Sequence, residues 1–204
     1  KTASQYLKTH FNQHLKSEPV VVYRGIEHDE FPYSFKPTED WLKKKFKLHA
    51  KHAHNKKVLL PGRFSEIKGG MGLIPWLEKT DANISLMVNA TPDESKFSRQ
   101  FNDALLKTGL SERVMWLGVE RDMKQLYAWA DVVLSVNKKP ESFGRTVLEA
   151  LTMGRPVVGF DHGGVSEVMS DLFPEGLIPV NNWNELSEKI TKFIKHPPEV
   201  KPHC

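Results

Sequence analysis

The chain has 204 residues, of which 39% are hydrophobic and 26% charged, and its net charge is +4. This length supports one large domain, or one domain with an appendage, around a real hydrophobic core. Cys204 is the only cysteine, so an internal disulfide framework is excluded and a reducing compartment, the cytoplasm, is expected. No apolar run approaches the length of a membrane span, and the first residues lack the apolar centre of a signal peptide.

The first 37 residues differ in pattern from the rest of the chain. Residues 3–16 have helical periodicity, and residues 19–23, PVVVY, are an apolar run typical of a strand that continues into a turn at Gly25. No helical pattern follows this turn directly. We therefore assign residues 1–37 to an entry helix with an interdomain linker, and residues 38–204 to the main domain.

Residues 42–57 concentrate the basic charge of the chain, with seven lysines and three histidines. A nucleic-acid patch, or a metal cluster of His49, His52 and His54, would be the functional interpretations. The stretch contains no aromatic residue besides Phe46, and its histidines follow no known ligand spacing. We interpret it as a solvated helix end with its connecting loop, and we expect no nucleic-acid partner.

From residue 57 onward, short apolar runs alternate with helical patterns. We expect strands at 57–62, 84–90, 113–118, 131–136, 155–160 and 175–180, and helices at 69–79, 94–108, 121–129, 144–153, 164–169 and 182–195. This alternation is typical of a parallel sheet with helices on both faces. Right-handed crossovers then give a doubly wound, Rossmann-like α/β fold of about six strands, whose ligands bind in the loops after the strands.

Most catalytic and cofactor motifs are missing from the sequence. There is no Gly-x-Gly-x-x-Gly turn after a strand, no P-loop, no His-Glu-x-x-His and no Gly-x-Ser-x-Gly. There is also no Asp-x-Asp pair, which argues against a Mg²⁺–diphosphate chelate of the usual acidic kind. We therefore expect neither a metal nor another cofactor. Two other features remain.

The first feature is residues 61–70, PGRFSEIKGG, directly after the first strand of the predicted sheet. The chain turns at Gly62, and two cations, Arg63 and Lys68, follow within six residues. Arginine can bind a diphosphate with two parallel hydrogen bonds, and lysine acts as a point charge. The loop therefore suits a diphosphate, although two surface cations on a loop would look the same in sequence.

The second feature is residues 140–160, PESFGRTVLEALTMGRPVVGF, in which a helix starts near Gly144. The free N–H groups of Gly144, Arg145 and Thr146 form an anion site at that start. Glu149 lies about 7–8 Å further along the axis, and Glu141 lies in the loop on the other side. A nucleoside diphosphate sugar fits this layout, with ribose hydroxyls at one acid and sugar hydroxyls at the other. The alternative is a solvated Glu141 and a helix-surface Glu149.

Taken together, these stretches resemble the C-terminal half of a family 4 glycosyltransferase. The residues that carry the resemblance are GRFSEIKGG, ESFGRTVLE, ALTMGRPVVGFDHGGVSEV and the entry VVYRGIEHDEF, and residues 58–195 match most securely. Enzymes of this family have two facing Rossmann-like domains, the B-type fold. The family usually has Asn and Asp in the entry motif where this chain has Arg24 and Glu27, a departure in the segment that joins the domains.

The resemblance implies which residues bind the donor. Arg63 and Lys68, in the loop that begins at Gly62, would hold the diphosphate from one side. The backbone after Phe143, at Gly144, Arg145 and Thr146, would hold it from the other side. Glu141 would contact the transferred sugar and Glu149 the ribose, while Val119 and Glu120 would meet the base through backbone atoms. Arg63, Lys68 and Glu141 would be the catalytic set.

The resemblance also implies metal-independent hexosyl transfer with retention of anomeric configuration, in polysaccharide or lipopolysaccharide biosynthesis. The donor would be a UDP-, GDP- or ADP-linked sugar, and the acceptor would be held by a missing N-terminal domain. The full-length enzyme could then associate peripherally with the inner face of a membrane. A non-catalytic nucleotide-sugar binding module and a UDP-GlcNAc 2-epimerase-like enzyme remain the alternatives.

Overall fold

The computed structural model describes residues 2–20, 22, 25–27 and 29–201, and it contains a six-stranded parallel sheet. The strands are β1 Lys56–Leu60, β2 Ile84–Val88, β3 Val114–Trp116, β4 Val132–Ser135, β5 Val157–Phe160 and β6 Leu177–Ile178. The α-helices are α1 Thr2–Phe11, α2 Glu39–Leu48, α3 Leu73–Lys79, α4 Lys96–Thr108, α5 Met123–Trp129, α6 Arg145–Thr152, α7 Gly163–Leu172 and α8 Trp183–Lys195.

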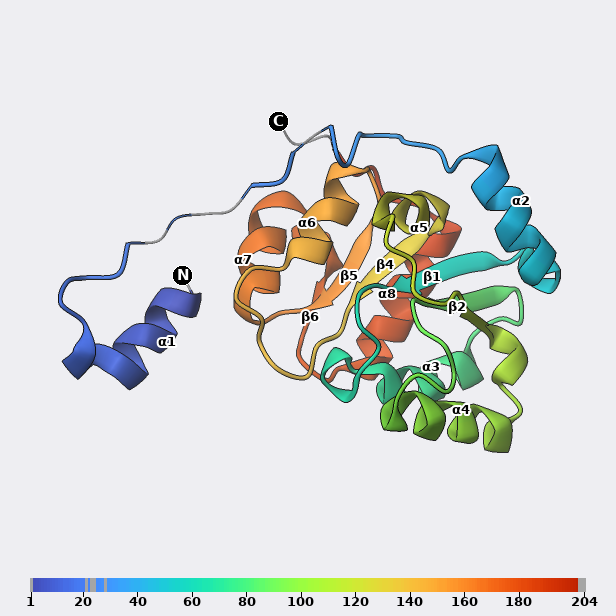
Figure 1. The fold of residues 1–204 in the computed structure, drawn as a ribbon, viewed down its shortest axis with the longest axis horizontal. Coiled ribbons are helices and arrows are strands. Elements are labelled where there is room, and N and C mark those ends of the chain that lie inside the picture. The colour runs from blue at the N-terminus through green and yellow to red at the C-terminus, as the bar shows by residue number, and fades with distance from the viewer. Residues whose placement is uncertain (1, 21, 23–24, 28, 202–204) are drawn as a thin grey trace.

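The strand order is β3-β2-β1-β4-β5-β6, and every neighbouring pair is parallel. Helices α3, α4 and α8 cover one face of the sheet, and α5, α6 and α7 cover the other (Figure 1). The doubly wound α/β fold predicted from the sequence is confirmed. All six strands fall within the predicted apolar runs to within one residue.

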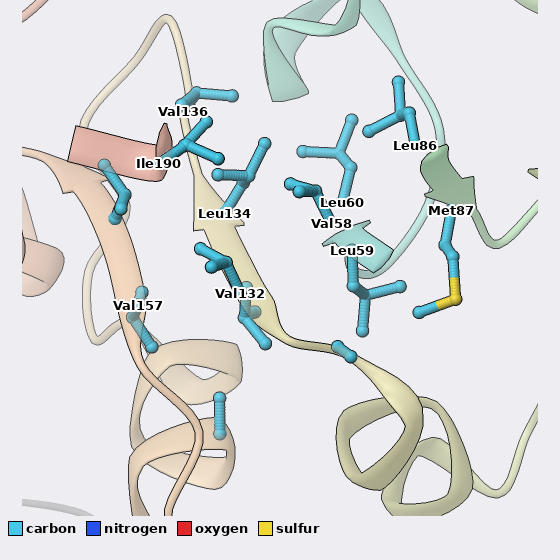
Figure 2. Packing of buried hydrophobic residues seen from close by; sticks show 14 of the residues in the cluster. Val58, Leu59, Leu60, Leu86, Met87, Val132, Leu134, Val136, Val157 and Ile190 are labelled. Carbon is cyan, nitrogen blue, oxygen red and sulfur yellow. The ribbon is translucent and has the colours of Figure 1, made fainter. Parts of the chain in front are cut away.

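The core of the domain lies on both faces of the sheet because the strands are buried at consecutive positions rather than at alternate ones. Leu59 and Leu60 in β1 point to opposite faces, as do Leu86 and Met87 in β2 (Figure 2). All four side chains are buried. The rigid edge formed by the ends of these strands is where the loops of the site begin.

The N-terminal segment departs from its prediction. The helix expected over 3–16 consists of α1 and a 3-10 turn, Asn12–His14. No strand forms at the described positions of the apolar run, and Val20 and Val22 are 85% and 82% exposed. The other apolar positions of that run, 21 and 23, lie outside the described residues. An extended apolar segment becomes a strand only where a neighbouring strand accepts its hydrogen bonds, and none lies beside it here.

The Lys/His-rich stretch is less solvated than its composition suggested. The side chains of Lys45, His52 and Lys57 are buried. Lys45 donates to the carbonyl of Leu117 at 3.1 Å, and Lys57 donates to the carbonyl of Asn55 at 2.6 Å. These contacts attach α2 and its connection to the sheet, so part of the basic excess is structural.

The buried imidazole of His52 hydrogen-bonds through Nδ1 to the hydroxyl of Ser85, 2.7 Å away. Burial, followed by the charge of Lys51, lowers the pKa of His52 from 6.5 to about 4. Across the described ranges, no group of three His, Cys, Asp or Glu side chains is arranged to hold a metal ion. Within the same ranges, each helix is too short or too polar to cross a bilayer.

Candidate functional site: a cationic and acidic crevice at the sheet switch point

The candidate site lies where the strand order reverses. β1 and β4 are neighbours in the sheet, but the chain leaves β1 toward β2 and leaves β4 toward β5. The loops after the two strands therefore lead to helices on opposite faces of the sheet, and doubly wound folds have their ligand-binding crevice beyond the carboxyl ends of strands at such a point. Both sequence features predicted as binding elements, residues 61–70 and 140–149, follow these two strands.

Lys68 and Glu141, one from each loop, meet across this crevice. The ammonium of Lys68 donates to Oε2 of Glu141 at 3.3 Å, and the amide of Asn137 donates to the same oxygen at 2.7 Å. The Lys68 and Glu141 side chains are partly exposed, so an approaching ligand can reach both groups. Sequence reasoning missed Asn137, whose only signal was its place at the end of the fourth predicted strand.

The two loops are fixed to one another by backbone contacts. The amide of Lys138 donates to the carbonyl of Ile67 at 2.7 Å. Gly69 has φ +78°, and a Cβ there would lie 2.1 Å from the carbonyl oxygen of Val136, so only glycine fits. This close approach holds Lys68, which lies in a 3-10 turn ahead of α3 rather than at the start of a helix, against the β4 loop.

Arg63 does not join this pair. The chain turns at Gly62, with φ +83°, and the Arg63 side chain is exposed. Within the described part of the chain, Arg63 takes part in no hydrogen bond or ion pair. The structure therefore places one of the two predicted cations at the crevice beside Glu141 and leaves the other in solvent on the same loop.

The N-terminus of α6 is free to bind an anion. Gly144, the N-cap, has φ +84°, and the first helical amides with a backbone acceptor are those of Val147 and Leu148, both donating to the Gly144 carbonyl. The amides of Gly144, Arg145 and Thr146 precede them, and such first-turn amides lack intrahelical acceptors. Their alignment with the helix dipole is of the kind that favours an anion, and the predicted anion site at this helix start stays a prediction.

The start of α7 supports this loop from behind. The amide of Gly164 donates to the carbonyl of Glu141 at 2.7 Å, and a Cβ on Gly164 would lie 2.4 Å from the backbone of Phe143. The half-buried Phe143 side chain, together with Arg145, lines a cavity of about 170 Å³ that also contacts Glu27 and Glu30. The backbone of residues 141–143 is therefore held against the start of α7.

Glu149 lies deeper than expected for a helix-surface acid, because it is 5% exposed. Its Oε2 accepts a hydrogen bond from the hydroxyl of Tyr127 at 2.8 Å, and its Oε1 accepts one from Nε of Arg145 at 2.6 Å. The simple alternative of a solvated surface charge is wrong. Tyr127, from α5, is a further residue that sequence reasoning missed.

The loop after β3 contains Val119 and Glu120, the two residues predicted to contact the base. Asn89 clamps Glu120: its side-chain oxygen accepts from the Glu120 amide at 2.6 Å, and its amide donates to the Glu120 carbonyl at 3.1 Å. The Glu120 backbone is thereby occupied. Val119 is 68% exposed, and its backbone N–H and C=O have no partner among the described residues. Of the two residues predicted to meet the base, Val119 therefore has free backbone groups and Glu120 does not.

The Glu120 carboxylate is also engaged within the fold. It accepts from the indole N–H of Trp41 at 2.9 Å and lies 3.6 Å from the ammonium of Lys45. Burial raises the pKa of this carboxyl, but the hydrogen bonds from Trp41 and the backbone together with the Lys45 charge outweigh it, so the pKa is lowered overall. Glu120 thus ties α2 to the loop that presents Val119.

The chain also matches a known protein family. The model for the group 1 glycosyl transferases matches residues 43–202, and the chain belongs to that family. Its fold is that of the C-terminal half of the two-domain, B-type glycosyltransferases, as the sequence resemblance implied.

Three proteins illustrate the likeness. The uncharacterized glycosyltransferase MJ1178 of Methanocaldococcus jannaschii is 24% identical over 197 residues, covering 95% of this chain and 48% of that protein. Anabaena HepE, solved in complex with UDP and glucose, is 27% identical with a TM-score of 0.78, over 95% of this chain and 52% of that one. The C-terminal domain of the Francisella tularensis group 1 glycosyl transferase LpcC shares the fold at 20% identity, with a TM-score of 0.62 over 84% of this chain and 88% of that domain.

This chain covers only part of the length of the two larger relatives. It spans about half the length of MJ1178 and of HepE. The match to the LpcC fragment is more nearly complete, and that fragment is a C-terminal domain by itself. The present chain therefore corresponds to one half of a two-domain architecture.

Proposed function

We propose that this chain is the donor-binding half of a metal-independent, retaining glycosyltransferase that transfers a hexosyl group from a nucleoside diphosphate sugar. The observation that carries the proposal is the Lys68–Glu141 pair, 3.3 Å apart, at the sheet switch point, in which Glu141 lies on the loop that leads to the N-terminus of α6. A cation and a helix start suit a diphosphate, and the acid beside them suits sugar hydroxyls.

The chemistry of the transfer fits these groups. Cleavage of the anomeric C–O bond leaves negative charge on the diphosphate and positive charge on the sugar. The Lys68 ammonium, the exposed Arg63 guanidinium and the first amides of α6 would stabilise the leaving diphosphate, and each such donor contributes a few kcal/mol, about 2.7–4 in measured cases. Glu141 would hold the transferred sugar beside the breaking bond, Glu149 would contact the ribose, and Val119 would bind the base.

The complete enzyme would need a second domain to hold the acceptor. The relatives are about twice as long as this chain, which supports that second domain. The isolated chain would then bind donor without turning it over. UDP bound to HepE makes a UDP-linked sugar the first donor to test, with GDP- and ADP-linked sugars next. The full-length enzyme would be cytoplasmic and would associate peripherally with the inner face of a membrane.

Calorimetric titration of the chain with UDP, GDP, ADP and uridine tests the proposal. We expect a nucleoside diphosphate to bind more tightly than its nucleoside, with the same affinity in EDTA. Lys68→Met should weaken diphosphate binding about 10- to 100-fold, the scale of a charge-assisted hydrogen bond, and leave uridine binding nearly unchanged.

Lys138→Met is the matched control. Lys138 is a neighbouring lysine whose ammonium pairs with Glu66 at 3.1 Å, outside the proposed phosphate site. Its loss should change neither affinity. A requirement for Mg²⁺ or Mn²⁺, or equal losses for diphosphate and nucleoside in Lys68→Met, would contradict the proposal.

A further inference from the structure

A buried hydroxyl stands directly behind the acid of α6. Tyr127 is fully buried in α5, and its hydroxyl donates to Oε2 of Glu149 at 2.8 Å. Burial, and then the charge of Glu149, raises the pKa of the Tyr127 hydroxyl well above its ordinary value of 10. The hydroxyl therefore keeps its proton and remains a donor at every physiological pH.

The Glu149 carboxylate keeps acceptor capacity beyond its two internal partners. An ionised carboxylate offers about four acceptor positions. Tyr127 uses one on Oε2, and Nε of Arg145 uses one on Oε1. Two positions remain, one on each oxygen, and a vicinal diol donates two hydrogen bonds. The Arg145 side chain, which donates to Oε1, is 59% exposed, whereas the Glu149 side chain is 6% exposed.

The orientation of this carboxylate depends on the tyrosine. The last torsion of a glutamate side chain is broad and has no strongly preferred value. A hydrogen bond from a fully buried phenol fixes that torsion, since Tyr127 is itself held by packing, including the ring of Phe31 at 6.3 Å. Arg145 is exposed and flexible, and it cannot fix the plane to the same degree.

We propose that Tyr127 is a positioning residue for ribose recognition: its hydroxyl holds the Glu149 carboxylate so that one acceptor position on each oxygen faces the ribose diol. The proposal rests on the proposed function, in which Glu149 contacts the ribose. Tyr127 itself touches no part of the ligand. The effect of Tyr127 is confined to the ribose hydroxyls and does not extend to the phosphates or the base.

The test compares UDP with 2′,3′-dideoxyuridine diphosphate, which lacks the diol. In the unaltered chain UDP should bind more tightly, and this ratio measures ribose recognition. Tyr127→Phe should lower the ratio about five- to tenfold, the effect of one hydrogen bond, and leave the affinity for the dideoxy compound unchanged. Phe31→Leu, which alters packing around the same ring and keeps the hydroxyl, should preserve the ratio.

Glu149→Gln separates this proposal from the proposed function. If Glu149→Gln keeps the ribose preference, Glu149 does not bind ribose and the proposed function fails at that residue. If Glu149→Gln loses the preference and Tyr127→Phe keeps it, Glu149 binds ribose without help from Tyr127 and the positioning role is overturned. Equal weakening of both ligands by Tyr127→Phe would show a general structural role and would also overturn it.

A second measurement needs no variant of Tyr127 and so holds even if Tyr127→Phe does not fold. The chain contains four tyrosines, and ¹³C-labelled tyrosine rings can be followed by NMR. The ring signals of Tyr127 should shift on addition of UDP and shift much less with the dideoxy compound. Equal shifts with the two ligands would contradict a role confined to the ribose.

Discussion

Seven residues separate Glu141 from Glu149 in the sequence, yet the two side chains have different surroundings. Glu141 is partly exposed and accepts hydrogen bonds from a lysine and an amide at the mouth of the crevice. Glu149 is buried and accepts from a phenol and a guanidinium. One acid is therefore placed to exchange partners with a ligand, while the other is held in one orientation.

The first prediction separates the two ends of the donor. Glu141→Gln should leave UDP affinity equal or slightly higher, because the Lys68 ammonium loses its internal counter-ion and becomes more available to phosphate. The same variant should weaken binding of the matching UDP-sugar about tenfold, since a neutral amide accepts more weakly from the sugar hydroxyls. Calorimetry with UDP and UDP-glucose measures both effects.

Glu66→Gln provides the control for this prediction. Glu66 is exposed and pairs with Lys138 on the same pair of loops. Its neutralisation changes the local charge by the same amount, so any effect of charge alone would appear in both variants. A loss of UDP affinity in Glu141→Gln would indicate that the acid supports the loop rather than the sugar.

At the scale of elements, the start of α6 depends on one backbone conformation. Gly144 has φ +84°, and an added Cβ would lie 3.2 Å from the carbonyl oxygen of Gly164 at the start of α7. Gly144→Ala should therefore cost about 1–2 kcal/mol in the free energy of unfolding, the strain of a left-handed conformation. It should also shift the first-turn amides and weaken UDP binding at least fivefold, about 1 kcal/mol.

Gly109→Ala is matched to this variant in backbone strain alone. Gly109 ends α4 with φ +71°, and a Cβ there would meet nothing within 4 Å. It should lose a comparable amount of stability in urea titrations and keep the UDP affinity of the unaltered chain. If the two variants lose UDP affinity to the same extent, the effect comes from stability and not from the helix start.

A second prediction at the scale of elements concerns the connection between α2 and β1, where His52 makes the stability of the fold depend on pH. The pKa of His52 is lowered to about 4 in the folded chain, below its ordinary value of 6.5. Between pH 6.5 and pH 4, His52 is protonated in the unfolded chain and neutral in the folded chain. The free energy of unfolding therefore decreases as the pH falls from 6.5 toward 4. The loss from this residue reaches up to about 1.4 kcal/mol per pH unit.

Urea unfolding at pH 7.5, 6.0 and 5.0 measures this slope. His52→Gln removes the titrating group and should flatten the slope, although the variant is less stable at neutral pH because a buried hydrogen bond to Ser85 is altered. His54→Gln, at an exposed position two residues further on, should retain the full slope. An unchanged slope in His52→Gln would assign the pH dependence to other groups.

The sequence predicted the elements better than their supporting contacts, for a physical reason. A mostly apolar run without regular polar alternation, such as residues 84–88, is typical of a strand buried on both faces, so the pattern itself indicates the sheet. The crevice follows from topology once two loops are placed after neighbouring strands. Asn89, Asn137 and Tyr127 could not be found this way, because a polar residue at a strand end or on a helix has many possible partners.

At the scale of the whole molecule, α1 lies outside the layers of the sheet and its covering helices (Figure 1), and Ala3 and Leu7 of α1 line a cavity together with Val168 and Leu172 of α7. The apolar side chains of this region are largely exposed: Tyr6, Leu7, Phe11, Val20 and Val22. Among the described residues, Phe31 is the first buried member of the hydrophobic core, and the partly buried Ile26 packs against that core. The second domain that we propose for the complete enzyme would cover these side chains, since exposed apolar clusters of this kind mark contact surfaces.

The last prediction concerns the exposed N-terminal residues 1–24. Deletion of residues 1–24 should change the melting temperature by less than about 4 °C, the shift expected for roughly 1 kcal/mol in a domain of this size, because little apolar area is buried by these residues. UDP affinity should stay within twofold, since the residues of the switch-point crevice begin at Gly62. Sedimentation should show less self-association, because the exposed apolar side chains of α1 are gone. Loss of folding or of UDP binding in the shortened chain would instead assign residues 1–24 to the donor-binding domain itself.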